Sequence, residues 1–137
     1  MVTELEKGGS LFNYVGARKN QLKEERARDI CHRIAQAIEY LHDYGIMLGQ
    51  IDLDCVIMTD QTDVAVPRIS KFNKARIMYP GTTIKDGQPV GKLLFWAPEL
   101  CNEIPYDFKI DVWSFGAICY YLLTGTFHVT KRKDNAN

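Results

Sequence analysis

The short stretch from Gly45 to Met58 contains the residues best suited to chemistry. A carboxylate can act as a general base or supply oxygen to a hard cation such as magnesium, so Asp52 and Asp54 are candidates for either role. The neutral amide of Gln50 cannot act as a general base near pH 7, and the Cys55 thiol is a poor partner for a cation that prefers oxygen. The stretch therefore combines two acids with two groups that are unsuited to proton transfer or magnesium binding.

Residues 48–55 read Leu-Gly-Gln-Ile-Asp-Leu-Asp-Cys and follow a Gly-Ile strand signal. This string resembles the catalytic loop of protein kinases, His-Arg-Asp-Leu-Lys-Pro-Glu-Asn. The resemblance implies that Gln50 stands in place of the aspartate that accepts the proton of the attacking hydroxyl. It also implies that Asp52 replaces the lysine that steadies the transferring phosphoryl group, and that Cys55 replaces the asparagine that holds magnesium.

Residues 68–76 resemble the segment that carries the Asp-Phe-Gly motif in the same family. Lys71 takes the place of the aspartate, whereas Phe72 is kept. That aspartate is the main magnesium ligand in kinases, and a lysine ammonium in its place would repel the ion. Two interpretations of Lys71 stay open: it mimics the charge of the ion by pairing with Asp52 or Asp54, or it is a solvated surface lysine.

Two further strings keep the residues that hold the kinase fold. Residues 91–99 resemble the Gly-Thr-x-x-Tyr-x-Ala-Pro-Glu stretch, and residues 111–116 resemble Asp-x-Trp-Ser-x-Gly. The resemblance implies that Asp111 caps the central helix and hydrogen-bonds the loop backbone, with a plain helix N-cap as the alternative. In the family, the glutamate matching Glu99 pairs with an arginine of a later helix. The residues expected to maintain the fold are Gly8, Gly9, Phe72, Ala97, Pro98, Glu99, Asp111, Trp113 and Gly116.

Residues 1–14 resemble the kinase hinge and the start of the helix that follows it. The backbone at Thr3, Glu4, Leu5 and Glu6 gives weak candidates for adenine binding, implied by the resemblance alone. No glycine-rich loop and no Val-Ala-Ile-Lys strand precede them, so we expect a fold without the small lobe. We therefore predict no cofactor and no metal ion.

The hydrophobic spacing indicates an α+β fold that is mainly α-helical. The family resemblance implies that this fold is a partial large (C-terminal) lobe of the kinase type. Apolar residues recur three and four positions apart over residues 22–44, which predicts one amphipathic helix that stops near Gly45. Residues 110–123 are apolar on nearly all sides. That pattern predicts a buried helix, too short to span a membrane.

Two smaller elements complete the expected fold, a helix near residues 10–15 and a hairpin of residues 56–58 with residues 68–70. We expect one partial kinase-like domain over residues 1–130. The polar residues 131–137 are expected to form a disordered tail.

The composition is that of a globular protein without a charge bias. The 137 residues are 46% hydrophobic and 25% charged, and Lys+Arg 17 balance Asp+Glu 17. This balance predicts neither nucleic acid nor a membrane as a partner. The four cysteines are far apart and form no Cys-x-x-Cys pair. We therefore expect reduced thiols, no zinc site and a cytoplasmic location.

The selective loss of the catalytic groups predicts a pseudokinase, which is a kinase-like protein that is not an enzyme and acts by binding other proteins. It would serve as a scaffold, an allosteric partner or a structural component of an assembly. The expected partner covers the apolar surface that the small lobe and later helices would otherwise cover. Two alternatives remain: an active or ATP-binding serine/threonine kinase with a divergent site, and a non-autonomous fragment of a larger kinase-like protein. The hinge and the buried helix look most similar to calcium/calmodulin-type kinases.

Overall fold

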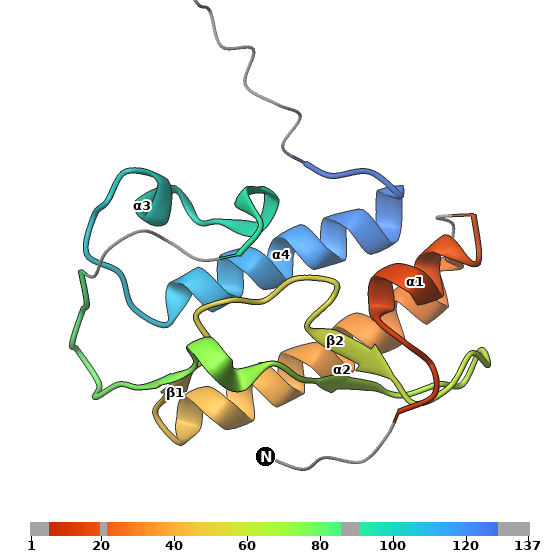
Figure 1. Cartoon of the computed structure of the whole chain (residues 1–137), viewed down its shortest axis with the longest axis horizontal. Helices are drawn as coiled ribbons and strands as arrows, with labels where there is room; N and C mark the ends of the chain where they lie inside the picture. The colour runs from red at the N-terminus through yellow and green to blue at the C-terminus, as the bar shows by residue number, and fades with distance from the viewer. Residues whose placement is uncertain (1–5, 20–21, 86–90, 129–137) are drawn as a thin grey trace, which may run out of the picture.

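The computed structural model describes residues 6–19, 22–85 and 91–128 (Figure 1). Thr3, Glu4 and Leu5 of the hinge-like segment, and the predicted tail, lie outside these residues. The helices are α1 (Leu11–Gly16), α2 (Glu24–Asp43), α3 (Pro98–Cys101) and α4 (Lys109–Thr124), with the 3-10 helices η1 (Phe72–Lys74) and η2 (Leu93–Phe95). The strands are β1 (Ile46–Met47), β2 (Val56–Met58), β3 (Pro67–Ile69) and β4 (Arg76–Ile77). Helices α2 and α4 pack against each other through the middle of the molecule (Figure 1).

Helix α2 forms where the apolar spacing predicts it. Its buried positions, Ala27, Ile30, Ile34 and Ile38, recur three and four apart and face the core. Burying one isoleucine side chain is worth about 1.5–3 kcal/mol, so this face outweighs the modest helix propensity of isoleucine. The helix stops before Gly45, whose φ of 72° is a left-handed conformation that glycine adopts without strain.

Helix α4 differs from its prediction, because it is buried on one side only. Ile110, Ser114, Ile118 and Leu122 recur at helical spacing on the buried face, and Gly125 ends the helix at a φ of 70°. The opposite side carries large apolar residues that remain exposed: Val112, Trp113, Tyr120 and Leu123. The expectation of burial on nearly all sides is therefore wrong for this outward face, whose side chains are only partly covered by the described residues.

The two-stranded sheets are short and antiparallel. Strand β2 pairs with β3 so that Val56 lies opposite Ile69 and Met58 lies opposite Pro67. The observed partner strand is one residue earlier than the predicted one, because the ladder begins at Pro67 at the edge of the sheet. Strands β1 and β4 form the second pair. Together the two pairs flank the loop that connects β1 to β2.

The predicted small helix near residues 10–15 corresponds to α1. The Ser10 hydroxyl caps it by accepting from the backbone nitrogen of Asn13 at 3.3 Å. Its Leu11, Tyr14 and Val15 join the main core beside α2. A second, smaller cluster surrounds Met47 and Ile110. Both clusters contribute to the packing around the loop, so its backbone is firmly held.

Candidate functional site: the loop between β1 and β2

Asp111 is the residue that holds the loop in place. Its carboxylate accepts hydrogen bonds from the backbone nitrogen of Leu48 at 2.8 Å and of Gly49 at 2.9 Å. It also contacts Nε2 of His42 at 2.8 Å, and Asp111 itself is only 1% exposed. The N-cap of α4 is Phe108, so the plain N-cap interpretation of Asp111 is wrong. The aspartate stabilises the loop rather than the end of its own helix.

The side chain of Asp52 accepts hydrogen bonds within its own turn. One of its oxygens accepts from the backbone nitrogens of Asp54 and Cys55, both at 2.8 Å, and the residue is 3% exposed. Such a carboxylate turn fixes the backbone of the loop from Asp52 to Cys55. A carboxylate oxygen that already accepts two backbone hydrogen bonds has less capacity left for a metal ion.

Cys55 is a buried and unreactive thiol. Burial raises its pKa to about 12, and the neighbouring Asp52 adds to the shift because it accepts from the thiol and repels a thiolate. The thiol is therefore protonated at neutral pH. It packs in the core as a small apolar side chain and offers no oxygen to a hard cation.

Lys92 is a site residue that the sequence analysis did not single out. Its ammonium pairs with Asp54 and lies 3.7 Å from Oδ2 of Asp52. The hydrogen bond from Lys92 holds the pKa of the Asp54 carboxyl below its usual range. The only signal in the sequence is the opposite charge of residues that are distant along the chain. Lys92 thus places a cation beside the position where the resemblance implies a lost lysine, at Asp52.

Lys71 is exposed, has a left-handed backbone with a φ of 63° and precedes η1. The ion pair with Asp54 is made by Lys92 and not by Lys71, so the surface interpretation of Lys71 describes its position better. Phe72 packs partly buried against the main core.

Gln50 lies against Gly91. A Cβ added at Gly91 would come within 2.9 Å of Cγ of Gln50. At the hinge-like segment, Glu6 pairs with Arg68 at 2.7 Å.

The residues expected to maintain the fold occupy two kinds of place. Gly8 lies against the turn after β2, Gly9 precedes α1 with a φ of 69°, Ala97 is buried, and Pro98 begins α3. Glu99, Trp113 and Gly116 instead line a groove on the outward side of α4. Trp113 is 42% exposed, so it does not contribute to the core as expected. The groove has a volume of about 610 Å³ and is also lined by Lys109, Val112, Ala117, Tyr120 and His128.

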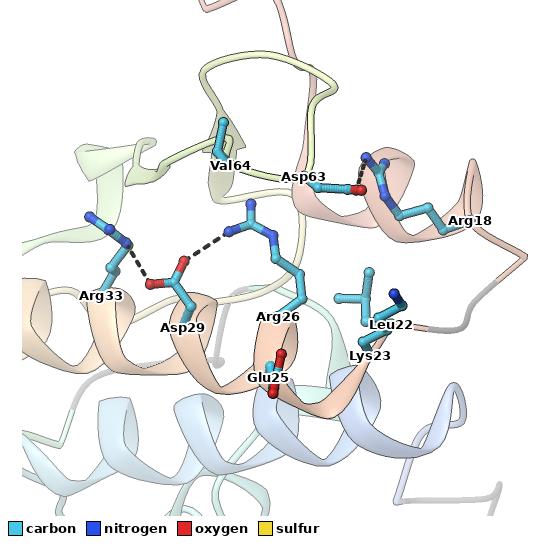
Figure 2. Close-up of a pocket in the computed structure, with 9 residues that line it drawn as sticks. All are labelled: Arg18, Leu22, Lys23, Glu25, Arg26, Asp29, Arg33, Asp63 and Val64. Atoms are coloured by element: carbon cyan, nitrogen blue, oxygen red, sulfur yellow. Dashed lines mark hydrogen bonds and ion pairs between the residues drawn. The ribbon is translucent and has the colours of Figure 1, made fainter.

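A second hollow, of about 650 Å³, lies between α1, α2 and the β2–β3 turn (Figure 2). Its arginines are paired within the chain: Arg18 with Asp63 at 3.2 Å, Arg26 with Asp29 at 2.8 Å and Arg33 with Asp29 at 3.0 Å. The Arg18 pair joins two separate segments, whereas Arg26, Asp29 and Arg33 all lie on α2. Among residues 6–19, 22–85 and 91–128, no group of three or more His, Cys, Asp or Glu could hold a metal ion. None of the helices in these ranges is both long and apolar enough for a membrane span.

Comparison with known proteins identifies the family of the chain. Residues 1–137 match the family described as the protein kinase domain. The chain is 32% identical over 126 residues to an SNF1-related protein kinase catalytic subunit alpha from Arabidopsis thaliana. The alignment covers 92% of this chain and 24% of that protein. It is 31% identical to a probable myosin light chain kinase from Dictyostelium discoideum, covering 91% of this chain and 31% of that protein. A calcium/calmodulin-dependent protein kinase from Emericella nidulans is 30% identical, with the same two coverages of 91% and 31%.

The chain belongs to the protein kinase domain family, and it spans about a quarter to a third of the length of these relatives. The family and the similarity to calcium/calmodulin-type kinases are confirmed. The expectation that the protein is not an enzyme is wrong, because its relatives are named as protein kinases and the chain therefore belongs to an enzyme family. That expectation came from the loop residues that differ from the kinase pattern, Gln50 and Cys55 among them.

Proposed function

We propose that this chain is a part of the large lobe of a serine/threonine protein kinase domain whose own contribution is to bind a protein segment along the outward face of α4. The observation that carries the proposal is the apolar groove over that face. Val112 is 55% exposed, Tyr120 is 44% exposed, and Trp113 lines the same groove. A cluster of exposed large apolar residues on one helix face is typical of an interaction site.

The walls of the groove favour a protein occupant. Trp113 and Tyr120 both contact the ring of His128, at centroid distances of 6.1 and 6.0 Å. Tryptophan and tyrosine are the residue types that most often dominate binding energy at protein interfaces. Gly116 has no heavy atom of another segment within 4 Å of a Cβ added there, which leaves room for a side chain of the occupant.

Two polar groups define the chemistry of the occupant. Nδ1 of His128 is buried and has no hydrogen-bond partner within the described residues. The half-buried Glu99 carboxylate makes no ion pair with any lysine or arginine of those residues. A buried polar atom without a partner costs free energy that a ligand can recover. We therefore expect an amphipathic segment that sets apolar side chains on Trp113 and an arginine against Glu99, as the family resemblance implies for a later helix.

A peptide titration tests this proposal. The probe is an amphipathic helical peptide with leucines three and four positions apart and one arginine beside them. We expect saturable binding, followed by tryptophan fluorescence. Replacing the peptide arginine by glutamine, or Glu99 by Gln in the chain, should weaken binding about tenfold, which is about 1.4 kcal/mol. The two changes made together should weaken peptide binding no more than either change alone.

The matched control is Tyr79→Ala, which removes an exposed aromatic residue away from the groove. Trp113→Ala should abolish binding, whereas Tyr79→Ala should leave it unchanged. Binding that survives Trp113→Ala, measured with a fluorescent label on the peptide, would place the interaction elsewhere and overturn the proposal.

A second candidate function is phosphoryl transfer from ATP to a serine or threonine hydroxyl by the whole protein. The names of the relatives favour it, and so does the loop frame held by Asp111. Asp54 is the acid that would then replace the missing base, since it is less buried than Asp52. The full-length protein should incorporate labelled phosphate into a serine-containing peptide, and Asp54→Asn should abolish that activity. Incorporation that persists in Asp54→Asn would exclude Asp54 from this role.

A further inference from the structure

The hollow between α1, α2 and the β2–β3 turn carries more positive than negative charge (Figure 2). Four of its side chains are lysine or arginine and three are carboxylates, which leaves one positive charge in excess. Asp29 serves two of the cations at once, because its two oxygens pair with Arg26 at 2.8 Å and with Arg33 at 3.0 Å. The charges within the hollow therefore do not satisfy one another completely.

Two arginines form an ordered floor. Besides its pair with Asp29, Arg26 donates to the Tyr14 hydroxyl at 3.2 Å and to the backbone oxygen of Ala65 at 2.5 Å. Cζ of Arg18 lies 3.7 Å from the centre of the Tyr14 ring, and its guanidinium donates to a backbone oxygen of the β2–β3 turn at 2.6 Å. A ligand therefore meets cations that are already ordered, which lowers the entropy cost of binding.

Two further cations keep donors for a ligand. Lys23 is exposed, and its ammonium makes no hydrogen bond or ion pair with any other residue that the structure describes. Arg33 uses only its Nε, for Asp29, so its two terminal nitrogens have no partner within the same residues. Figure 2 shows Lys23 and Arg33 on opposite sides of Arg26. An anionic chain laid over Arg26 would therefore have a cation at each end.

The Arg18 cation is accessible as well, because its carboxylate partner is weakly held. Asp63 lies 3.2 Å from Arg18, but the Asp63 side chain is 90% exposed. An ion pair so well solvated contributes little, so the carboxylate of a ligand can replace it.

Apolar side chains lie beside these cations. Val64 is exposed at the β2–β3 turn, and Leu22 is half-buried ahead of α2. A ligand that matches both kinds of wall carries several carboxylates and at least one apolar side chain. A segment of an acidic protein has this composition, whereas a small inorganic anion does not.

We propose that this hollow binds an extended acidic segment of a partner protein. Carboxylates of the segment pair with Lys23 and with the terminal nitrogens of Arg33, a geometry in which arginine holds a carboxylate through two parallel hydrogen bonds. An apolar side chain of the segment packs on Val64. The proposal does not depend on the groove of α4, since no residue lines both sites.

The test uses the 137-residue chain and a fluorescein-labelled peptide of sequence Glu-Glu-Leu-Glu-Glu, followed by fluorescence anisotropy. We expect saturable binding that weakens about tenfold between about 0.05 M and about 0.5 M NaCl, because salt screens exposed charges. The same peptide with glutamine in place of each glutamate should not bind. Equal binding of the two peptides, or tighter binding of a single-stranded oligonucleotide, would overturn the proposal.

Variants of the chain locate the site. Lys23→Gln and Arg33→Gln should each weaken binding about fivefold, whereas Arg28→Gln, an exposed position of α2 outside the hollow, is the matched control and should not. Asp63→Asn should tighten binding severalfold because it frees Arg18, an effect that loss of structure would not produce.

The proposal fails if Lys23→Gln and Arg33→Gln bind the acidic peptide as well as Arg28→Gln does. Trp113→Ala should leave this binding unchanged, which separates it from binding at the α4 groove. The comparison of the two peptides on the unaltered chain decides the question even where a substitution impairs folding.

Discussion

Nε2 of His42 lies 2.8 Å from the Asp111 carboxylate oxygen that also accepts the backbone hydrogen of Leu48. One buried carboxylate thereby joins the last turn of α2, the loop after β1 and the first turn of α4. The loop backbone is held independently of the polar side chains of the loop, because the carboxylate that accepts its hydrogen bonds comes from α4.

Replacing Asp111 should strongly destabilise the chain. Asp111→Ala leaves the backbone nitrogens of Leu48 and Gly49 without an acceptor, and an unpaired buried donor costs about 1–3 kcal/mol. We expect the free energy of unfolding to fall by about 3 kcal/mol, measured by urea denaturation. His42→Ala is the matched comparison and should cost less, because it removes a single contact to the same carboxylate. Equal losses for both variants would contradict the role given to the backbone bonds.

Two glycine substitutions should have opposite effects. A Cβ at Gly8 would lie 2.3 Å from the backbone oxygen of Met58 and 2.4 Å from that of Asp60. Gly8→Ala therefore forces the backbone apart and should cost more than about 2 kcal/mol of stability. Gly116→Ala adds a Cβ that meets no other segment within 4 Å, in the interior of α4. It should stabilise by up to about 1 kcal/mol because alanine is the better helix former.

Thermal and urea denaturation of both variants provide the measurement. A Gly8→Ala variant as stable as the wild type would mean that the segment before α1 does not pack against the turn after β2. A destabilised Gly116→Ala variant would mean that another part of the chain covers the groove at this position.

The local elements were predictable from the sequence, and the contacts between distant residues were not. The spacing of Ile30, Ile34 and Ile38 defines α2, because a helix face depends only on residues within a few turns. The pair Lys92 and Asp54 depends instead on how separate segments pack, which residue spacing does not encode. The loop-holding role of Asp111 came from the family resemblance.

The outward face of α4 is a second feature that the sequence alone does not predict. A run that is apolar on nearly all sides indicates that every side of a helix is covered by something. It does not say what covers each side. Among the described residues, α2 and η2 cover one side of α4, and the side that carries Trp113 stays partly exposed.

The Lys92–Asp54 pair should add to stability only above acidic pH. Lys92 lowers the pKa of Asp54 in the folded state, so the folded chain binds fewer protons here than the unfolded chain. The contribution is complete above the unfolded pKa of about 3.9 and is lost as the pH falls through the lower folded value. Both side chains are partly solvated, at 48% and 33% exposure, so we expect at most about 1 kcal/mol.

Urea denaturation at pH 7 and pH 3 tests the pair. Lys92→Gln should lower stability at pH 7 and have a smaller effect at pH 3. Lys109→Gln is the control, because the Lys109 side chain is 84% exposed and its ammonium lies 3.9 Å from the Asp107 carboxylate. An effect of Lys92→Gln that is equal at both pH values would show that the lysine acts through packing and not through the charge of Asp54.

Cys55 should resist alkylation in the folded chain. Its pKa of about 12 follows first from burial and then from the Asp52 carboxylate, which would repel a thiolate. At pH 8 the thiolate fraction is about one in ten thousand, and the sulfur is also covered by the core. Iodoacetamide should therefore label Cys101 quickly and leave Cys55 unmodified, as measured by mass spectrometry of peptides.

Two comparisons separate burial from charge as the reason for this inertness. In urea, Cys55 and Cys101 should react at the same rate, since neither burial nor Asp52 then acts on the thiol. Asp52→Asn removes the repelling charge, keeps an oxygen that can accept from the loop backbone and should lower the pKa of Cys55. Its labelling should remain slow, because burial is the larger cause. Rapid labelling in folded Asp52→Asn would instead make the carboxylate the main protection, and rapid labelling of the folded wild type would show that the loop opens readily.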